Sequence, residues 1–501
     1  MTALLLLPPL AAALVGAVAA TSVSALVTRL SGVLTSAVLL ATGIVLLAHR
    51  GPVPALGGDL LRADPLSALM LAVVGAVGLT ATWAGLAPRP RPGDGPRPAA
   101  TRSDRRYATL VAVFLGAMAT AVTTDNLGLL WVAVEATTIA TAFLVGHRGG
   151  PRSVEAAWKY VVLGSVGIAI ALLGTVLLYA ASRSAGEATL SWTRLASGDL
   201  PLDHGLVRVA VGLAVLGFAT KAGLAPMHSW LPDAHSQAPA PVSGLMSGVL
   251  LAVAFYAILR IRTIADVVLG PGLVRGLLLA AGLGSLAVAA ALILRQRDHK
   301  RMLAYSSIEH MGVLAVGAAV GGPIALAAVL LHLIGHGLAK ASLFVVAGRM
   351  LAAEGTTTIA DVRGLLARRP DVAVPLVVGM TALLGFPPFA LFFSEVAIVL
   401  AGWRAGLGWA MGLAVALLLV VVAGLVRATA SMVLGPAHDD PPGDAGATGE
   451  TTAGAHAGGH GSDRGPMTPL VLALGATAVI GFLAVPVGDV LARAAATLGL
   501  A

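Results

Sequence analysis

Several acids, lysines and histidines in this sequence lie inside long apolar stretches, where little water would reach them. Glu135 lies in WVAVEATTIA, Lys221 in GFATKAGLAP and Glu395 in FFSEVAIVL. A charge at the centre of a bilayer costs about 2.5–3.5 kcal/mol on an insertion scale, so each such residue needs a partner, water or a function. Because these side chains can all take up and release protons, the first hypothesis is proton transfer.

A group of histidines and a lysine share a second pattern. His332, His336 and Lys340 lie in LHLIGHGLAKASLF at spacings of four residues, which places them on one face of a helix. At 1.5 Å per residue they span about 12 Å of depth, and Glu309 and His310 lie in a neighbouring apolar stretch, YSSIEHMG. A lone buried histidine is commonly satisfied by a hydrogen bond, but a file of groups that titrate near neutrality favours a proton relay.

Two apolar stretches contain signals for a helix break beside a buried charge. Gly223 and Pro226 follow Lys221, and GFPPF at 385–389 precedes Glu395. Proline removes a backbone donor and clashes with the preceding turn. Kinks of this kind are common in membrane helices. Their coincidence with buried charges nevertheless favours a transport site, since paired interrupted helices in two halves of a chain indicate such a site.

The elements that hold these residues are predicted to be membrane helices. Hydrophobic residues make up 57% of the chain, charged residues 11%, and the mean hydropathy is +0.90. Soluble domains carry about 25% charged residues. The chain has no cysteine, which excludes disulfides and thiolate-ligated iron–sulfur clusters. We therefore expect no cofactor and no metal in this chain, and no nucleic-acid partner, because its basic residues lie in loops between apolar runs.

We predict an all-α, polytopic membrane protein with about fourteen transmembrane helices. The first is taken as a spanning helix and not a signal peptide, because no Lys or Arg precedes Arg29. Odd-numbered loops carry about twice as many Lys and Arg residues as even-numbered loops, which predicts a cell-membrane protein with both termini outside. The predicted helices lie at roughly 3–23, 30–48, 66–88, 107–124, 127–146, 158–181, 206–227, 239–260, 272–294, 302–321, 323–348, 371–401, 405–433 and 467–496.

One long loop, at 436–465, is rich in Gly, His and Asp and is predicted to be disordered. Its histidines His438, His456 and His460 are widely spaced. That spacing favours a solvated linker over a metal site.

Long motifs in this sequence resemble those of a known family. They are EAAWKYVVLGSVGIAIALLGTVLLY at 155–179, KAGLAPMHSWLPDAHSQAPAPVSGLMSGVLL at 221–251, DHKRMLAYSSIEHMG at 298–312 and GHGLAKASLFVVAG at 335–348. They are similar to the proton-conducting subunits shared by complex I, membrane-bound hydrogenases and multisubunit sodium/proton antiporters. The first motif and FFSEVA at 392–397 most resemble the hydrogenase-4 component F branch. The likeness covers about 107–433.

The resemblance implies two inverted five-helix repeats, with the seventh and twelfth helices broken. The implied units are 1–106, three N-terminal helices and a cytoplasmic loop; 107–262, the first repeat; 263–433, the second; and 434–501, the disordered loop and a final helix.

The resemblance also implies roles for single residues. Glu135 and Lys221 match the glutamate and lysine that pair in the first half-channel, and His310 and His336 match the central relay. Glu395 matches the terminal group of the twelfth helix. The predicted proton relay consists of Glu135, Lys221, His310, His332, His336, Lys340 and Glu395. The predicted supporting residues are Lys159, His228, Glu309 and Tyr256.

The sequence departs from the family at one place. Many relatives have a lysine in the eighth helix, where this chain has Ala252. A link between the halves would then use water, Ser243, Ser247 or Tyr256, or it would be absent.

The leading hypothesis is a proton-translocating membrane subunit of a redox-driven complex of the hydrogenase-4 or NADH:quinone oxidoreductase type. Partner subunits would carry the redox centres, so this chain alone would not be an oxidoreductase. One alternative is a subunit of a cation/proton antiporter or another non-redox assembly. Another is an inactive membrane anchor, for which Ala252 is the best evidence. Haem ligation by His310, His332 or His336 is a further, disfavoured idea, because haem needs axial ligands paired across its site.

Overall fold

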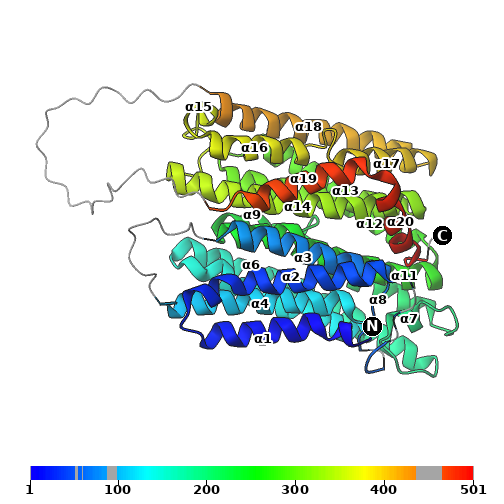
Figure 1. The fold of residues 1–501 in the computed structure, drawn as a ribbon. Coiled ribbons are helices and arrows are strands. Elements are labelled where there is room, and N and C mark those ends of the chain that lie inside the picture. Colours follow the sequence, from blue (N-terminus) through cyan, green and yellow to red (C-terminus); the bar gives the residue numbers. More distant parts are fainter. Residues whose placement is uncertain are drawn as a thin grey trace, which may run out of the picture.

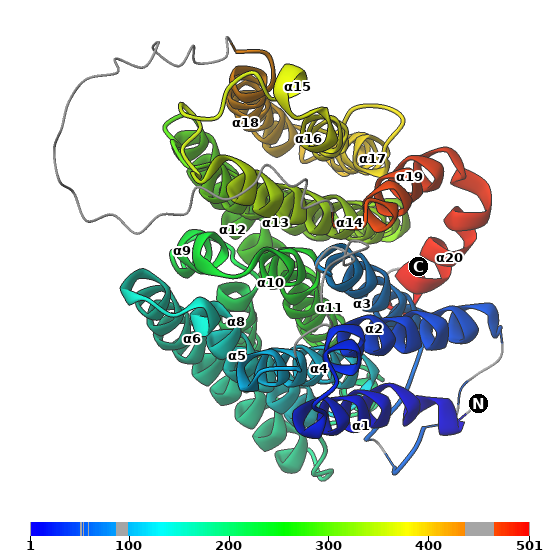
Figure 2. The same cartoon turned by 60° about the vertical axis from the view of Figure 1, so that its left-hand side comes forward.

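The computed structural model describes residues 2–50, 53, 55–58, 60–86, 99–435 and 465–499. In this part of the chain every regular element is a helix, and extended backbone pairs only through isolated bridges. The long helices run side by side in one bundle (Figures 1 and 2). Two predicted loops lie mostly outside the described residues. They are the loop between the helices predicted at 66–88 and 107–124, and the loop at 436–465 with His438, His456 and His460.

The first half of the bundle begins with a short 3₁₀ turn, η1, and ends with a helix that contains a π-helical segment, η3. Polar residues from the loops cap several of these helices: Asp64 accepts a hydrogen bond from the Ser67 amide at 2.7 Å, and Asn126 accepts two amide hydrogen bonds. The elements are η1 (Thr2–Leu5), α1 (Leu7–Thr21), α2 (Ala25–Ala48), α3 (Pro65–Ala84), α4 (Arg102–Thr123), α5 (Leu127–Val145), η2 (Gly146–Arg148), α6 (Pro151–Ser184), α7 (Trp192–Leu195), α8 (His204–Lys221), α9 (Trp230–Gln237), α10 (Ala240–Leu245), η3 (Met246–Leu250) and α11 (Leu251–Leu269).

The second half holds the longest uninterrupted helix of this region, α14. Asp298 caps the helix before it by accepting the Arg301 amide at 2.8 Å. The elements are α12 (Gly272–Ile293), α13 (His299–Val320), α14 (Gly322–Glu354), α15 (Leu365–Arg368), α16 (Pro370–Leu383), α17 (Ala390–Arg404), α18 (Gly408–Leu434), α19 (Thr468–Phe482) and α20 (Ala484–Ala496).

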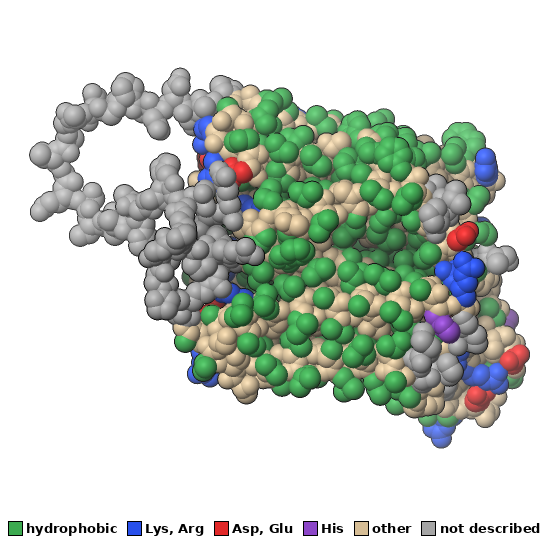
Figure 3. Space-filling view, in the orientation of Figure 1, with side chains coloured by type: hydrophobic (Ala, Val, Ile, Leu, Met, Phe, Trp, Pro, Cys, Tyr) green, Lys and Arg blue, Asp and Glu red, His purple; other side chains and the backbone are tan. Residues whose placement is uncertain are grey.

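The surface of the bundle is that of a membrane protein. Apolar side chains cover its flank, while charged side chains gather at its two ends (Figure 3). Large apolar residues such as Leu14, Trp158 and Leu419 are exposed. A long band of exposed apolar side chains between two charged ends matches a bilayer and not water.

The predicted all-α membrane fold is confirmed, whereas the predicted count of fourteen spans is not. Among the described residues, twelve helices are long and apolar enough to cross a membrane, or thirteen if a pair bent by 83° is counted as one span. That pair corresponds to the helix predicted at 467–496. The helix predicted at 371–401, with a break at GFPPF, consists of two shorter helices, α16 and α17, on either side of that break. The inverted repeats and unit boundaries stay predictions.

Two of the innermost helices, α13 and α14, carry the histidines of the predicted relay and Lys340. α13, α14 and the helix formed by α10, η3 and α11 are almost completely surrounded by other helices. Figure 1 places both chain ends at one end of the bundle and α15 at the other. Which end faces the cytoplasm stays a prediction from loop charge.

Candidate proton-transfer site

Lys221 is the centre of a first polar cluster. It is the last residue of α8 and is 0% exposed. Its ammonium group donates hydrogen bonds to the Thr138 hydroxyl of α5 at 2.7 Å and to the Tyr160 hydroxyl of α6 at 2.5 Å. Three helices therefore converge on one buried amine, and both of its side-chain partners are neutral.

The chain breaks directly after Lys221, as the sequence predicted. Gly223 has a φ of +74°, and a Cβ at this position would lie 2.4 Å from the Leu231 side chain. The Trp230 indole donates to the Thr220 carbonyl at 2.9 Å, and the Ala225 amide donates to the Ser285 hydroxyl at 2.8 Å. The backbone groups released by the break therefore have specific partners, so the break is a built part of the fold.

Glu135 does not contact Lys221 directly. No ion pair within 4.0 Å joins the two among the described residues, although their charges interact at longer range. One Glu135 oxygen accepts a hydrogen bond from the Ser165 hydroxyl at 3.3 Å, and the other lacks a partner in the described chain. Thr138 and Tyr160 take the ammonium's hydrogen bonds, so Glu135 acts on Lys221 only at longer range, and its role as the counter-ion stays a prediction.

A second cluster is built around three histidines of α13 and α14. His310 Nδ1 lies 3.1 Å from His332 Nε2, and the His336 ring centre lies 5.1 Å from that of His310. The Glu309 carboxyl oxygen lies 3.3 Å from His310 Nε2. The sequence predicted these residues one by one, and the structure brings all four together.

Ser394 of α17 determines which ring nitrogens donate and which accept hydrogen bonds in this cluster. Its hydroxyl donates to the Leu391 carbonyl at 2.8 Å, so it accepts from His332 Nδ1 at 2.9 Å. A neutral imidazole has one donor and one acceptor nitrogen. His332 Nε2 is therefore the acceptor for the N–H of His310, and His310 Nε2 faces Glu309. His310 Nε2 makes no hydrogen bond of good geometry in the described chain, so it is the nitrogen at which this chain of histidines can take up a proton.

Lys340 lies one turn beyond His336 on the same face of α14 and is completely buried. Its ammonium group donates to the Leu303 carbonyl at 2.6 Å and to the Ser306 hydroxyl at 2.5 Å. His332, His336 and Lys340, each four residues after the one before, therefore lie on one continuous helix, as predicted. Like Lys221, this lysine is held by neutral oxygen atoms.

Glu395 joins the histidine cluster at the second break. Donor atoms of Glu395, His310 and His332 all lie within 4.8 Å of one another. Gly385, in the break between α16 and α17, has a φ of +65°, and a Cβ there would lie 2.6 Å from a Glu395 carboxyl oxygen. Binding of a metal ion between the two histidines would require breaking the hydrogen bond that they share.

The predicted supporting residues do not lie together, and Tyr256 lies near Ala252 on α11. Glu309 belongs to the second cluster, and His228 lies half-buried in the break between α8 and α9. Lys159 is not a buried residue: its side chain is 47% exposed and pairs with Glu155 at 2.7 Å and Asp233 at 3.1 Å. The sequence analysis placed it at the start of a helix at 158, whereas α6 begins at Pro151.

The residues considered for a link between the two halves lie around Ala252, which is completely buried. The Ser247 hydroxyl lies 2.8 Å from that of Ser307, which joins η3 to α13. The Ser243 hydroxyl donates to the His235 carbonyl at 2.8 Å. Tyr256 donates to the Val122 carbonyl of α4 at 3.0 Å, and its hydroxyl lies 3.2 Å from that of Ser67 in α3.

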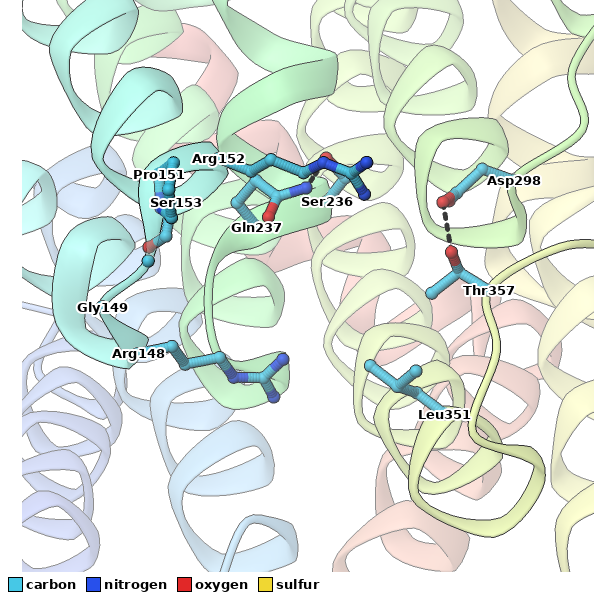
Figure 4. A pocket seen from close by; sticks show the side chains of 11 residues that line it. Arg148, Gly149, Pro151, Arg152, Ser153, Ser236, Gln237, Asp298, Leu351 and Thr357 are labelled. Carbon is cyan, nitrogen blue, oxygen red and sulfur yellow. Dashed lines mark hydrogen bonds between the residues drawn. The ribbon is translucent and has the colours of Figure 1, made fainter. Parts of the chain in front are cut away.

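A cavity of about 460 Å³ opens at one end of the bundle. Figure 4 shows Arg148 and Arg152 on one side and Asp298, hydrogen-bonded to Thr357, on the other. Ser236 and Gln237, at the end of α9, lie between them. The cavity is therefore formed where α6, α9, α13 and α14 meet.

The sequence analysis missed several residues of the site: Thr138, Tyr160, Ser306, Ser394 and His235. All of them lie inside stretches that were quoted for other residues. No spacing rule predicts contacts between helices that are distant in the sequence, so only the structure could assign them.

Broken membrane helices with buried lysines and a file of histidines define an integral membrane protein of the antiporter-like class. The chain belongs to the family described as NADH:quinone oxidoreductase/Mrp antiporter, TM, whose model matches residues 124–420.

Two curated relatives illustrate the family. A hydrogenase-4 component F homolog of Methylacidiphilum infernorum is 41% identical over 300 residues, which are 59% of this chain and 63% of the relative. NADH-quinone oxidoreductase subunit N 2 of Roseiflexus castenholzii is 33% identical over 362 residues, or 69% and 71% of the two chains. The first comparison thus spans less than two thirds of that relative's length.

Solved structures share the fold. A chain of respiratory complex I from Thermus thermophilus superposes with a TM-score of 0.71 at 25% identity, covering 97% of this chain and 99% of that one. A chain of the archaeal membrane-bound sulfane sulfur reductase gives 0.81 at 24% identity, with 99% and 96% covered. A chain of the Mrp complex from Dietzia gives 0.79 at 22% identity, with 99% and 97% covered. The last two show the fold alone.

Proposed function

We propose that this chain is a proton-translocating membrane subunit of a redox-driven complex of the hydrogenase-4 or NADH:quinone oxidoreductase type. The observation that carries the proposal is the pair of buried lysines, Lys221 and Lys340, whose hydrogen bonds in the described chain all go to neutral oxygens. A buried ammonium without a directly paired carboxylate is costly to keep charged. Such a group can therefore release its proton when the surrounding charge changes.

In this proposal Lys221 alternates between its charged and neutral states. The break after α8 lets unwound backbone and water solvate the charge, which packed helix cannot do. Glu135 acts at longer range, so its protonation changes the field at the lysine without a direct bond. Thr138 and Tyr160 hold the amine in place in both states.

The second cluster moves a proton by exchanging hydrogen-bond direction. When His310 takes a proton at Nε2 from the Glu309 side, it can release its Nδ1 proton to His332. His332 then releases its own Nδ1 proton toward Ser394 and Glu395. Each histidine gains one proton and loses another, so the charge of each ring is unchanged. Both rings then carry their proton on Nε2 and must return it to Nδ1 before the next transfer.

The proposed partners are subunits that would carry out electron transfer. It has no cysteine, and we propose that it holds no cofactor, so electron transfer would occur in other membrane and peripheral subunits. The names of the relatives, which include hydrogenase-4 and quinone oxidoreductase components, support this assignment. We further propose a cell-membrane location with both termini outside, from the excess of loop arginines.

A second candidate is a subunit of a cation/proton antiporter without redox chemistry. The family description and the likeness in fold to a chain of an Mrp complex favour it. An inactive anchor is a third candidate, because Ala252 replaces the lysine expected between the halves.

The test is purification of the assembled complex in mild detergent, identification of its subunits and reconstitution into liposomes with an entrapped pH-sensitive dye. Iron–sulfur, nickel or quinone-site partners support the redox proposal, and the partners of an antiporter support the second candidate. Lys221→Ala and Glu395→Ala should each abolish most proton pumping while the complex assembles. Asp199→Ala is the control, because Asp199 is an exposed acid paired with Arg194. Normal pumping by both relay variants would make the anchor the better account.

A further inference from the structure

His235 is a buried histidine to which the proposed function gives no role. It lies near the end of α9 and is 0% exposed. Neither ring nitrogen makes a hydrogen bond of good geometry within the described part of the chain, although the Leu231 carbonyl one turn earlier lies near the ring. Buried polar atoms without partners are rare in folded proteins and call for an explanation.

On the side that faces α14, His235 lies next to the row formed by His332, His336 and Lys340. Its ring centre lies 5.4 Å from that of Phe344. Phe344 follows His336 and Lys340 at the same four-residue spacing, so His235 lies beside the next turn of the same helix face. His235 also interacts electrostatically with both Lys340 and His336.

On its outer side, His235 approaches the cavity of Figure 4. Ser236 and Gln237, the two residues that follow it, line this cavity. The Lys300 ammonium donates to the carbonyls of Ser236 at 2.7 Å and Ala238 at 3.0 Å, which fixes the end of α9. Lys300 is itself completely buried and interacts electrostatically with His235.

We infer that His235 carries protons between this cavity and the histidine file, with Lys300 on the outer side and Lys340 and His336 on the inner side. The inference rests on the proposed function and adds to it the end of the bundle from which the second cluster exchanges protons. The imidazole takes a proton at one ring nitrogen and releases the proton of the other, so the ring is unchanged in charge after each transfer. Water bridges the gaps that exceed hydrogen-bond length.

Packing alone does not account for a histidine at this position. The ring lies between Trp230, with centres 6.3 Å apart, and Phe344. A phenylalanine would fill the same place between aromatic neighbours without burying two polar nitrogens. The substitution His235→Phe therefore distinguishes a structural role of His235 from a role in proton transfer.

The experiment compares His235→Phe and His235→Gln in the assembled complex, reconstituted into liposomes with an entrapped pH-sensitive dye. Phe keeps the ring and Gln keeps polarity, but neither exchanges protons as an imidazole does. We expect both to slow proton translocation about 100-fold or more, in the range that positioned acid–base groups contribute. The matched control is His299→Phe. His299 is 2% exposed and neighbours Lys300, and within the described chain its ring nitrogens make no hydrogen bond of good geometry, although the Thr356 backbone lies near the ring. This variant should pump like the unmutated complex.

Each outcome decides between the alternatives. Normal pumping by His235→Phe overturns the inference, and if Lys221→Ala and Glu395→Ala still fail to pump, the proposed function stands without it. If those two variants also pump normally, both are overturned. Loss of pumping in His299→Phe as well would show a packing defect at this end of the bundle and overturn the specific role of His235. If His235→Phe does not assemble, the result for His235→Gln decides.

Discussion

Lys221 and Tyr160 are joined by a hydrogen bond of 2.5 Å between the last residue of α8 and the third turn of α6. The tyrosine hydroxyl can accept this bond whether or not another group donates to it, and it carries no charge. The lysine is therefore positioned tightly without being fixed in its charged form. This relationship, and not a direct pair with Glu135, defines the first cluster.

Tyr160→Phe should weaken the charged state of Lys221. The variant removes one of the two side-chain hydrogen bonds to the ammonium, and a hydrogen bond to a charged group is worth about 1.5–3 kcal/mol. We expect slower proton pumping with normal assembly, measured with the entrapped dye. Tyr179→Phe is the control, since Tyr179 lies on the same helix and is 38% exposed. Equal proton-pumping rates for the two variants would show that Tyr160 does not contribute to proton transfer.

Lys159→Ala tests a residue that the sequence analysis had counted among the possible supporting groups. Its partners Glu155 and Asp233 lie with it at the exposed end of α6, and exposed ion pairs contribute about 0–1 kcal/mol. We therefore expect pumping and thermal stability close to those of the unmutated complex. A loss of pumping as severe as that of Lys221→Ala would mean that Lys159 acts in proton transfer despite its exposure.

The helices and the helical faces could be predicted from sequence, because both depend on local spacing. Apolar runs located most spans, and the interval from His332 to Lys340 located three residues on one face of α14. The break after Lys221 was predicted from Gly223 and Pro226, since glycine and proline act on the backbone beside them. These features need no knowledge of which helices are neighbours.

Contacts between helices could not be predicted in the same way. Ser394 is 62 residues from His332, and Tyr160 is 61 residues from Lys221. Such pairs depend on the rotation and depth of separate helices, which spacing does not determine. The same limit explains why the distance between Glu135 and Lys221 could not be predicted, and why His235, beyond a break, belonged to no periodic pattern.

Gly385→Ala should displace Glu395 and destabilise the second break. The position requires a φ of +65°, and the new Cβ would lie 2.6 Å from a Glu395 carboxyl oxygen. Strain at such a backbone position costs about 1–3 kcal/mol. We expect a lower melting temperature and weaker pumping than in Gly412→Ala, a helical position of α18 where a Cβ meets nothing within 4 Å. A melting temperature equal to that of the control would show that the break adapts freely.

Ser394→Ala should disturb the direction of the histidine chain. In the structure the Ser394 hydroxyl donates to Leu391, so it can only accept from His332. This fixes His332 with its proton on Nδ1 and leaves Nε2 as the acceptor for His310. Without the hydroxyl, His332 loses the partner that selects this tautomer.

The chain labelled with ¹⁵N-histidine gives the direct measurement, because the shifts of the two ring nitrogens report which one is protonated. We expect the unmutated chain to show His332 protonated on Nδ1, and Ser394→Ala to show a mixture of tautomers together with slower pumping. Ser394→Thr keeps a hydroxyl and should restore both. Ser342→Ala is the matched control, since the Ser342 hydroxyl is also buried and donates to a carbonyl one turn earlier, Leu338, at 2.9 Å. If His332 in the unmutated chain carries its proton on Nε2, the chain runs in the opposite direction, and Ser394 must donate to His332 in place of Leu391.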